Sequence, residues 1–196
     1  MTTPKILEYK KGGMGLRSVV YVERGLLEEV ITHLYTDNRL VMRIALATGL
    51  RVGDILELRI GDIRQGRAFP IIEHKTGKKK LVRIPAALRR EILATRSYCS
   101  EDGYYAFPHR LMPQTRHRTR SAVNKDILRV LRDMKAEVRI SPHTARKGYA
   151  VELYARTGDM ERVQQALNHS YITTTLVYAL SDKLGGRGVS NKPMSL

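Results

Sequence analysis

The chain has 196 residues, which fits one domain with a short appendage, and 42% of them are hydrophobic. That apolar share is enough for a packed core and excludes wholesale disorder. Its 35 Lys and Arg against 19 Asp and Glu give a formal net charge of +16. Such an excess predicts an anionic polymer as partner, nucleic acid first, and a basic protein without that partner is the alternative at this point.

Cysteine usage and hydropathy indicate the cellular compartment. Cys99 is the only cysteine, which excludes a disulfide framework and a cysteine-based zinc site and fits a reducing cytosol. No apolar run is long enough to span a bilayer, and the N-terminal sequence MTTPKILEYKKGG has no signal-peptide core. We therefore expect a cytoplasmic protein that makes no use of a membrane.

The first quarter of the chain predicts an arm followed by helices. Residues 1–20 carry three glycines among lysines and are interpreted as a basic arm. Apolar residues at helical spacing predict a helix over 22–35. A second helix is expected over 39–48, with Asp37 or Asn38 as its N-cap.

A change of composition follows that second helix. Gly49 is expected to end the second helix, and a further short helix is expected to begin near Val52. From residue 60 onward, short β-rich runs alternate with turn residues, which predicts paired strands at 69–73 and 81–84 with residues 75–78 as the hairpin tip.

Beyond the hairpin the pattern is helical again. Helices are predicted over 86–96 and 121–135, with an irregular basic stretch over 98–118 between them. Pro142 suits the first position of another helix. The chain is therefore expected to form a mainly helical domain with one small antiparallel sheet.

The last third holds residue types that suit phosphodiester chemistry. His143 and Arg146 lie three apart, followed by His169 and by Tyr178 nine residues later. An arginine offers a planar fork of donors to phosphate oxygens, and a histidine gives or takes a proton near neutral pH. A tyrosine becomes a covalent nucleophile once its proton is removed. These residues alone suggest a site that holds and attacks a phosphodiester.

Four segments together resemble the tyrosine recombinases, the integrases of phages and mobile elements, which are related in fold to type IB topoisomerases. The segments are ATGLRVGDILELR around Arg51, EHKTGKKKLVRIP around Lys75, SPHTARKGYA around His143 and Arg146, and LNHSYITTTLVY ending in Tyr178. They occur in the family's order. The resemblance implies an α+β, mainly helical catalytic domain over 21–180, a helical bundle with one small antiparallel sheet, and a C-terminal tail over 181–196 exchanged between protomers.

The resemblance also implies roles for individual residues. Arg51 corresponds to the first catalytic arginine and Asp54, three places later, to its supporting acid. The remaining catalytic set is the hairpin lysine Lys75, the H-x-x-R pair His143 and Arg146, the second histidine His169, and the nucleophile Tyr178. The implied reaction forms a 3′-phosphotyrosine and a free 5′-hydroxyl group, and its reversal needs neither ATP nor metal. No metal or other cofactor is therefore expected.

Two features depart from the family pattern. Asn168 stands where the family often has glycine before the second histidine, and asparagine tolerates the same positive-φ backbone. Family members also commonly carry a helical core-binding domain ahead of the catalytic one, whereas about twenty residues precede the first predicted helix here. A naturally short recombinase and the catalytic part of a longer chain both fit.

Several of these assignments have simpler alternatives. Arg51 could serve only as a charge at a helix end, and the two histidines could be structural. Lys75 is preferred over the lysines near it only because it begins a K-T-G pattern, and Tyr171 shares a helical face with Tyr178. Other basic residues are expected to contact DNA phosphates without catalysis. These are Lys78, Lys79, Lys80, Arg116, Arg118, Arg120, Lys125, Arg129 and Lys147.

The resemblance thus predicts a site-specific DNA recombinase whose partner is double-stranded DNA. It implies a homotetramer on DNA, a monomer when free, and an accessory DNA-bending or directionality factor. A non-cleaving DNA-binding regulator that keeps the recombinase fold is the alternative from another class. Topoisomerase-like relaxation without strand exchange is a third reading.

Overall fold

The structure is a computed structural model that describes residues 22, 24–66, 68–96 and 101–168. Within these ranges its elements run, in order, α1 (Arg24–Thr32), α2 (Thr36–Thr48), α3 (Val52–Leu56), α4 (Ile60–Arg64), β1 (Phe69–Ile72), β2 (Lys79–Val82), α5 (Ala86–Ala94), α6 (Arg120–Asp133), α7 (Pro142–Thr157) and α8 (Met160–Leu167). The expected architecture, mainly helical with one small antiparallel sheet, is confirmed. None of the helices in these ranges is long and apolar enough to cross a membrane.

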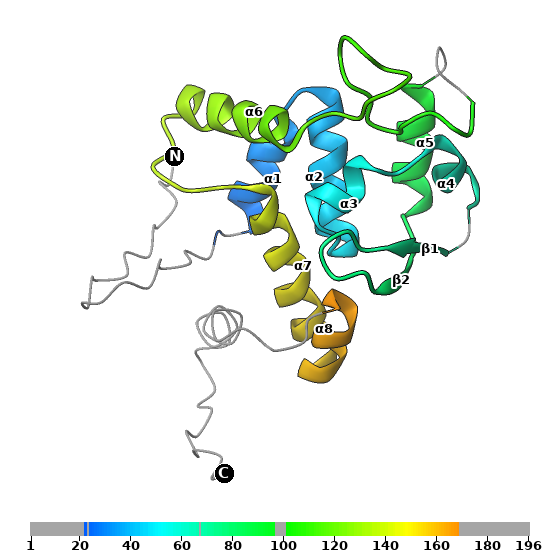
Figure 1. Ribbon diagram of the computed structural model, residues 1–196. Helices are drawn as coiled ribbons and strands as arrows, with labels where there is room; N and C mark the ends of the chain where they lie inside the picture. The colour runs from blue at the N-terminus through cyan, green and yellow to red at the C-terminus, as the bar shows by residue number, and fades with distance from the viewer. Residues whose placement is uncertain (1–21, 23, 67, 97–100, 169–196) are drawn as a thin grey trace, which may run out of the picture.

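Helix α2 forms the centre of the core. Its residues Leu40, Val41, Met42, Ile44 and Ala45 have no solvent exposure at all, as expected of a helix that other elements cover over most of its surface. Helix α7 packs along it, and α1, α3 and α5 contact it as well. Figure 1 shows α6 lying across one end of this bundle and α7 running away from it beside α2.

The sequence predicts the C-terminal cap of α2 correctly and its N-terminal cap incorrectly. The N-cap is Tyr35, so the prediction of Asp37 or Asn38 is wrong by two or three residues. Both side chains are instead engaged by distant partners: Asp37 by two arginines, and Asn38 by Asp126, to which it donates at 2.7 Å. At the other end, Gly49 caps the helix in the left-handed conformation, as predicted.

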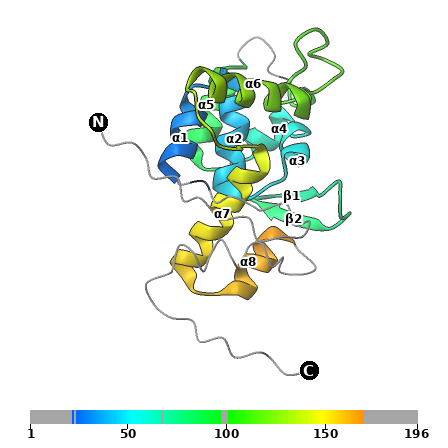
Figure 2. The same ribbon diagram turned by 90° about the vertical axis from the view of Figure 1, so that its left-hand side faces the viewer.

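The hairpin forms where the sequence predicts it. Strands β1 and β2 are antiparallel, with Phe69 opposite Val82 and Ile72 opposite Lys79, so the second strand begins two residues before its predicted start. Figure 2 shows the hairpin projecting from the body with α8 below it. Helix α4, in the segment interpreted as β-rich, was not predicted. Asp62 Oδ2 accepts a hydrogen bond from the Arg59 amide at 2.8 Å and fixes its start.

The C-terminal helices agree closely with the sequence. Helix α6 begins after Thr119, whose side chain accepts from the Ala122 amide at 3.1 Å, and Pro142 occupies the first turn of α7 as predicted. Asn168 caps the C-terminal end of α8 with φ 53°, so the expected left-handed asparagine is confirmed. The predicted arm over 1–20 and tail over 181–196 lie outside the described residues.

Candidate functional site

The C-terminal end of α2 brings together basic side chains from distant segments. The last carbonyl groups of a helix have no partner within the helix and carry its negative dipole end. Lys80 Nζ donates to the carbonyl oxygen of Thr48 at 3.3 Å, and Arg146 Nη1 donates to the carbonyl oxygen of Gly49. Arg51 follows immediately as the N-cap of α3. The end of one buried helix therefore positions three cations.

Arg146 is the most deeply buried of these cations. Its exposed fraction is only 2%, and its Nη2 donates to the carbonyl oxygen of Leu167 at 2.7 Å. The guanidinium thus links the end of α2 to the end of α8. Burial, and then the positive charge of Arg51, lower the pKa of Arg146 to about 10. It remains protonated at neutral pH, close to another arginine.

Arg51 is held by an acid that the sequence did not single out. Its Nη1 lies 2.6 Å from Glu73 Oε2 at the end of β1, and the Glu73 side chain has no solvent exposure. Burial raises the pKa of Glu73, but pairing with Arg51 and a hydrogen bond from Thr76 outweigh it, so the net pKa lies below the ordinary value. Glu73 is therefore a carboxylate in the folded protein.

Asp54, the predicted supporting acid, fixes the hairpin. It is buried on α3, and its Oδ1 accepts a hydrogen bond from the His74 amide at 3.0 Å. Burial, as the largest effect, raises the pKa of the Asp54 carboxyl group. Asp54 thereby ties α3, which begins after Arg51, to the residue that precedes Lys75.

The Lys80 side chain is more buried than expected of a lysine that contacts DNA phosphates from the protein surface. Burial, and then the charge of Arg146, lower the pKa of Lys80 to about 8. The strand's alternation offered a signal for this position: Lys80 shares a face of β2 with buried Val82, whereas Lys79 and Leu81 are exposed. We call Arg51, Arg146, Lys80, Glu73 and Asp54 the Arg51 cluster.

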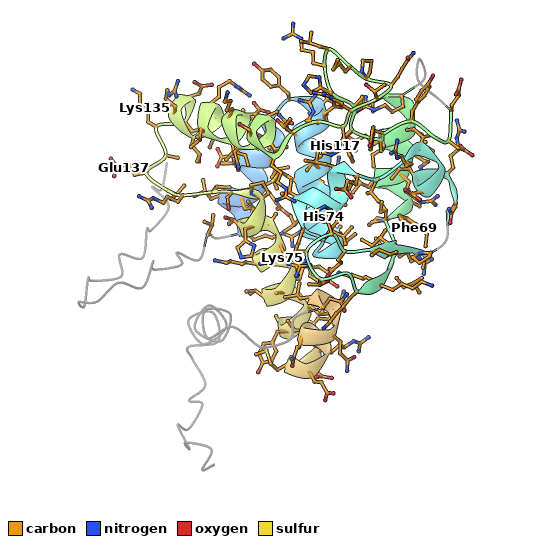
Figure 3. The ribbon with its side chains drawn as sticks, in the orientation of Figure 1. Phe69, His74, Lys75, His117, Lys135 and Glu137 are labelled. Atoms are coloured by element: carbon orange, nitrogen blue, oxygen red, sulfur yellow. The ribbon has the colours of Figure 1, made fainter. Side chains whose placement is uncertain are left out.

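Lys75 and His143 border the Arg51 cluster. Lys75 is exposed on the hairpin tip, and Figure 3 shows it next to His74 on that projecting tip. His143 is solvent-accessible in the first turn of α7. Its pKa is lowered first by partial desolvation of the ring and then by the charges of Lys147, Arg146, Arg51 and Lys75. The imidazole is consequently neutral at pH 7 and able to accept a proton.

The predicted phosphate contacts fall into several settings. Lys78, Lys79, Arg116 and Lys125 are exposed, and Lys147 is half-buried beside Arg146. Arg120 covers Gly53 on α3: a Cβ added to Gly53 would lie 2.2 Å from Arg120 Nη2. Arg118 pairs with Asp37 at 2.7 Å and Arg129 with Asp126 at 2.8 Å. The last two are thus held by the protein itself, and a contact with DNA stays a prediction for the whole set.

Two members of the predicted catalytic set cannot be placed. His169 and Tyr178 lie outside the described residues, which end at 168. Among the residues that the structure does describe, no group of three or more His, Cys, Asp and Glu side chains is arranged to hold a metal ion. The described part of the site is therefore a cluster of cations around two buried carboxyl groups.

Comparison with known proteins shows what the sequence and the fold of this chain are similar to. The model of the phage integrase family matches residues 22–184. The tyrosine recombinase XerA of Pyrococcus furiosus is 28% identical over 166 residues, covering 83% of this chain and 56% of the relative. The chain thus spans little more than half of that relative's length.

Solved structures share the fold. The crystal structure of XerA recombinase superposes with a TM-score of 0.67 at 21% identity, over 90% of this chain and 66% of that one. A structure of the site-specific recombinase XerH bound to its palindromic difH substrate, a post-cleavage complex, has a TM-score of 0.59 at 23% identity. It covers 82% of this chain and 49% of XerH.

Proposed function

This chain belongs to the phage integrase family, and we propose that it cleaves and rejoins DNA strands at specific sites through a 3′-phosphotyrosyl intermediate. The observation that carries the proposal is the meeting of Arg51 and Arg146 at the end of α2. Two guanidinium groups at one place match the non-bridging oxygens of a phosphodiester. The related XerH is bound to difH, which supports double-stranded DNA as the partner of this chain.

In the proposed cleavage step one bond to phosphorus forms, another breaks, and two protons move. The Tyr178 oxygen bonds to phosphorus while the bond from phosphorus to the 5′ oxygen breaks. His143, neutral at pH 7, takes the tyrosine proton, and Lys75 gives a proton to the departing 5′ oxygen. Arg51 and Arg146 stabilise the extra negative charge on the phosphate in the transition state, and His169 donates to the same oxygens.

Rejoining reverses these steps with a different strand. A 5′-hydroxyl group from the partner strand attacks the phosphotyrosine and releases Tyr178, so the ester bond itself supplies the energy. Asp54 contributes by holding the His74 amide and so the hairpin that carries Lys75. No ATP and no metal enter this scheme.

The proposed assembly follows the family. We expect a homotetramer on two DNA sites and a monomer in the absence of DNA, with the tail over 181–196 docking on a neighbouring protomer. An accessory DNA-bending or directionality factor would select the outcome. Lys78, Lys79, Arg116 and Lys125 are exposed and suit non-specific contacts with the phosphate backbone.

Covalent trapping tests the proposal. A pool of nicked duplexes with randomised sequence lets the short cleaved strand diffuse away, so that any adduct accumulates. Wild type and Tyr178→Phe are incubated with the pool, separated on a denaturing gel, and the attached DNA is sequenced. We expect an adduct with wild type, none with Tyr178→Phe, and a common sequence in the recovered DNA.

Other outcomes assign other functions. An adduct that persists in Tyr178→Phe moves the nucleophile to another tyrosine, Tyr171 first. An adduct without a common sequence favours topoisomerase-like relaxation. Tight binding without any adduct favours a regulator that keeps the fold and does not cut.

A further inference from the structure

Glu73 stands at the junction of the catalytic arginine and the hairpin tip. Its Oε2 lies 2.6 Å from Arg51 Nη1 and also accepts a hydrogen bond from Thr76 Oγ1 at 2.9 Å. Thr76 follows Lys75 directly in the chain. One carboxylate oxygen therefore connects Arg51 to the residue next to the proposed proton donor.

The backbone of Glu73 also shapes the tip. Its carbonyl oxygen accepts from the amides of Thr76 at 3.2 Å and Gly77 at 2.8 Å, and its own amide donates to the carbonyl oxygen of Lys78 at 3.0 Å. Any residue at this position would supply these main-chain bonds. Only the side chain adds the link between the tip and Arg51.

A fully buried carboxylate beside a phosphate site needs a physical reason. Burying a charge is costly unless it is paired, and a negative charge close to the proposed phosphate repels it. An arginine supplies five N–H donors in a rigid plane, so a close ion pair at Nη1 holds the guanidinium near Glu73 and leaves its other donors for a second anion. The arrangement fits an acid that sets geometry without taking part in the chemistry.

We propose that Glu73 is a positioning residue that couples Arg51 to the hairpin tip, so that the phosphate-binding arginine and Lys75 are placed together. This inference rests on the proposed function for its catalytic consequence. The link itself, from Arg51 through Glu73 to Thr76, exists in the folded protein without DNA. Catalysis and structure therefore give two separate tests.

The catalytic test compares two leaving groups on the DNA sequence recovered by trapping. In one substrate the scissile 5′ oxygen is retained, and in the other it is replaced by sulfur, which departs as a thiolate without needing a proton. Glu73→Gln keeps the size and a hydrogen-bonding group but removes the charge that orients Arg51. Thr76→Val removes the hydroxyl that donates to Glu73, together with the longer hydrogen bond that this hydroxyl accepts from the Lys78 amide at 3.3 Å, and leaves the Arg51–Glu73 pair in place. Glu57→Gln, an exposed carboxylate just beyond α3, is the matched control.

The expected pattern separates the two halves of the link. Thr76→Val is expected to cleave the oxygen substrate about tenfold more slowly than wild type, because proton donation by Lys75 is impaired. On the sulfur substrate, which needs no proton, the same variant should cleave at the wild-type rate. Glu73→Gln slows both substrates, and the oxygen substrate more, because Arg51 is misplaced too. Glu57→Gln matches wild type. If each of the variants Thr76→Val and Glu73→Gln slowed the oxygen and sulfur substrates by the same factor, the coupling would be contradicted.

The structural test needs no DNA and no activity. Hydrogen exchange of the Thr76 and Gly77 amides is measured in wild type, Glu73→Gln, Arg51→Met and the double variant. Coupling predicts several-fold faster exchange in each single variant and no further increase in the double variant. Independent, multiplying effects would overturn the inference. If trapping yields no adduct, the proposed function fails while this measurement still decides whether Glu73 links Arg51 to the tip.

Discussion

Two groups of arginines in this molecule satisfy their donors in different ways. In the first, Asp37 accepts from both Arg96 and Arg118, and we call these three residues the Asp37 cluster. Arg96 also donates to the carbonyl oxygens of Ala106 and Thr95. In the Arg51 cluster, Arg51 is paired with Glu73, whereas Arg146 and Lys80 donate to backbone carbonyl oxygens. A carbonyl group satisfies a donor without neutralising its charge. Both arginines of the Asp37 cluster are thus paired with an acid, whereas Arg146 and Lys80 of the Arg51 cluster keep their positive charge available to a ligand.

The pKa values of Arg146 and Lys80 show how crowded the positive charge is in the Arg51 cluster. Burial, and then the neighbouring cations, lower the pKa of Arg146 to about 10 and that of Lys80 to about 8. Charges that repel one another in a partly desolvated site are relieved by an added anion. A phosphodiester between Arg51 and Arg146 would provide it, so the strain that the free protein carries favours binding of the proposed ligand.

The largest expected effect tests the structural role of the Asp37 cluster. Asp37→Ala leaves Arg96, which is 4% exposed, buried without its carboxylate. Breaking a buried pair by removing one partner costs about 3–5 kcal/mol, so we expect that loss in the free energy of unfolding. Urea denaturation followed by circular dichroism measures it.

The matched control for Asp37→Ala is Asp102→Ala. Asp102 also pairs with an arginine, Arg64 at 2.5 Å, but its side chain is 68% exposed. Exposed pairs contribute about 0–1 kcal/mol, so this variant should unfold close to wild type. If Asp37→Ala lost no more stability than Asp102→Ala, the Asp37 cluster would not be the structural element inferred here.

The second prediction exchanges the fork of Arg51 for a point charge. Arg51→Lys keeps the positive charge and its attraction to Glu73 but loses the planar pair of donors. We expect the rate of covalent adduct formation to fall by about 10²–10³, the usual effect of removing one preorganised donor from a transition state. Arg64→Lys, the same exchange at an exposed pair, should leave the rate unchanged. An equal loss in both variants would contradict a specific role for Arg51.

Most of the fold was predictable because local patterns and tertiary packing agree. The helical period around Val123 and Ile127, the proline at 142 and the turn residues of the hairpin all point to the elements observed. The failures lie where distant partners decide. Asp37 reads as a helix cap, yet Arg96 and Arg118 bind it from other segments.

The site was predictable only in part, for a related reason. Arg51 and Arg146 are marked by their motifs, and the structure brings both to the end of α2. Glu73 opens the segment EHKTGKKKLVRIP but had no predicted role, because its role depends on a contact with Arg51, which is distant in the sequence. Lys80 is hidden within a run of lysines, and only the register of the two strands separates it from Lys79.

The smallest expected effect concerns Lys80 and depends on pH. Its folded pKa of about 8 lies below the ordinary 10.5, so the fold disfavours its charged form. Below pH 8 the lysine is charged in both the folded and the unfolded states, and the whole penalty is present. As the pH rises from 8 toward 10.5, the folded protein releases the proton first and the penalty disappears. Lys80→Met should therefore stabilise the protein at pH 7, on the order of 1–2 kcal/mol, and by much less near pH 10.

Urea denaturation at pH 7 and pH 9.5 measures this difference, with Lys79→Met as the control on the exposed face of the same strand. An advantage of equal size at both pH values would mean that methionine only improves packing, and that the Arg51 cluster carries no electrostatic strain at Lys80. Adding a short DNA duplex at pH 7 should reverse the order, because phosphate favours the charged lysine. A residue that destabilises the free protein and stabilises the bound one reserves its charge for the ligand, which is the property that separates the Arg51 cluster from the Asp37 cluster.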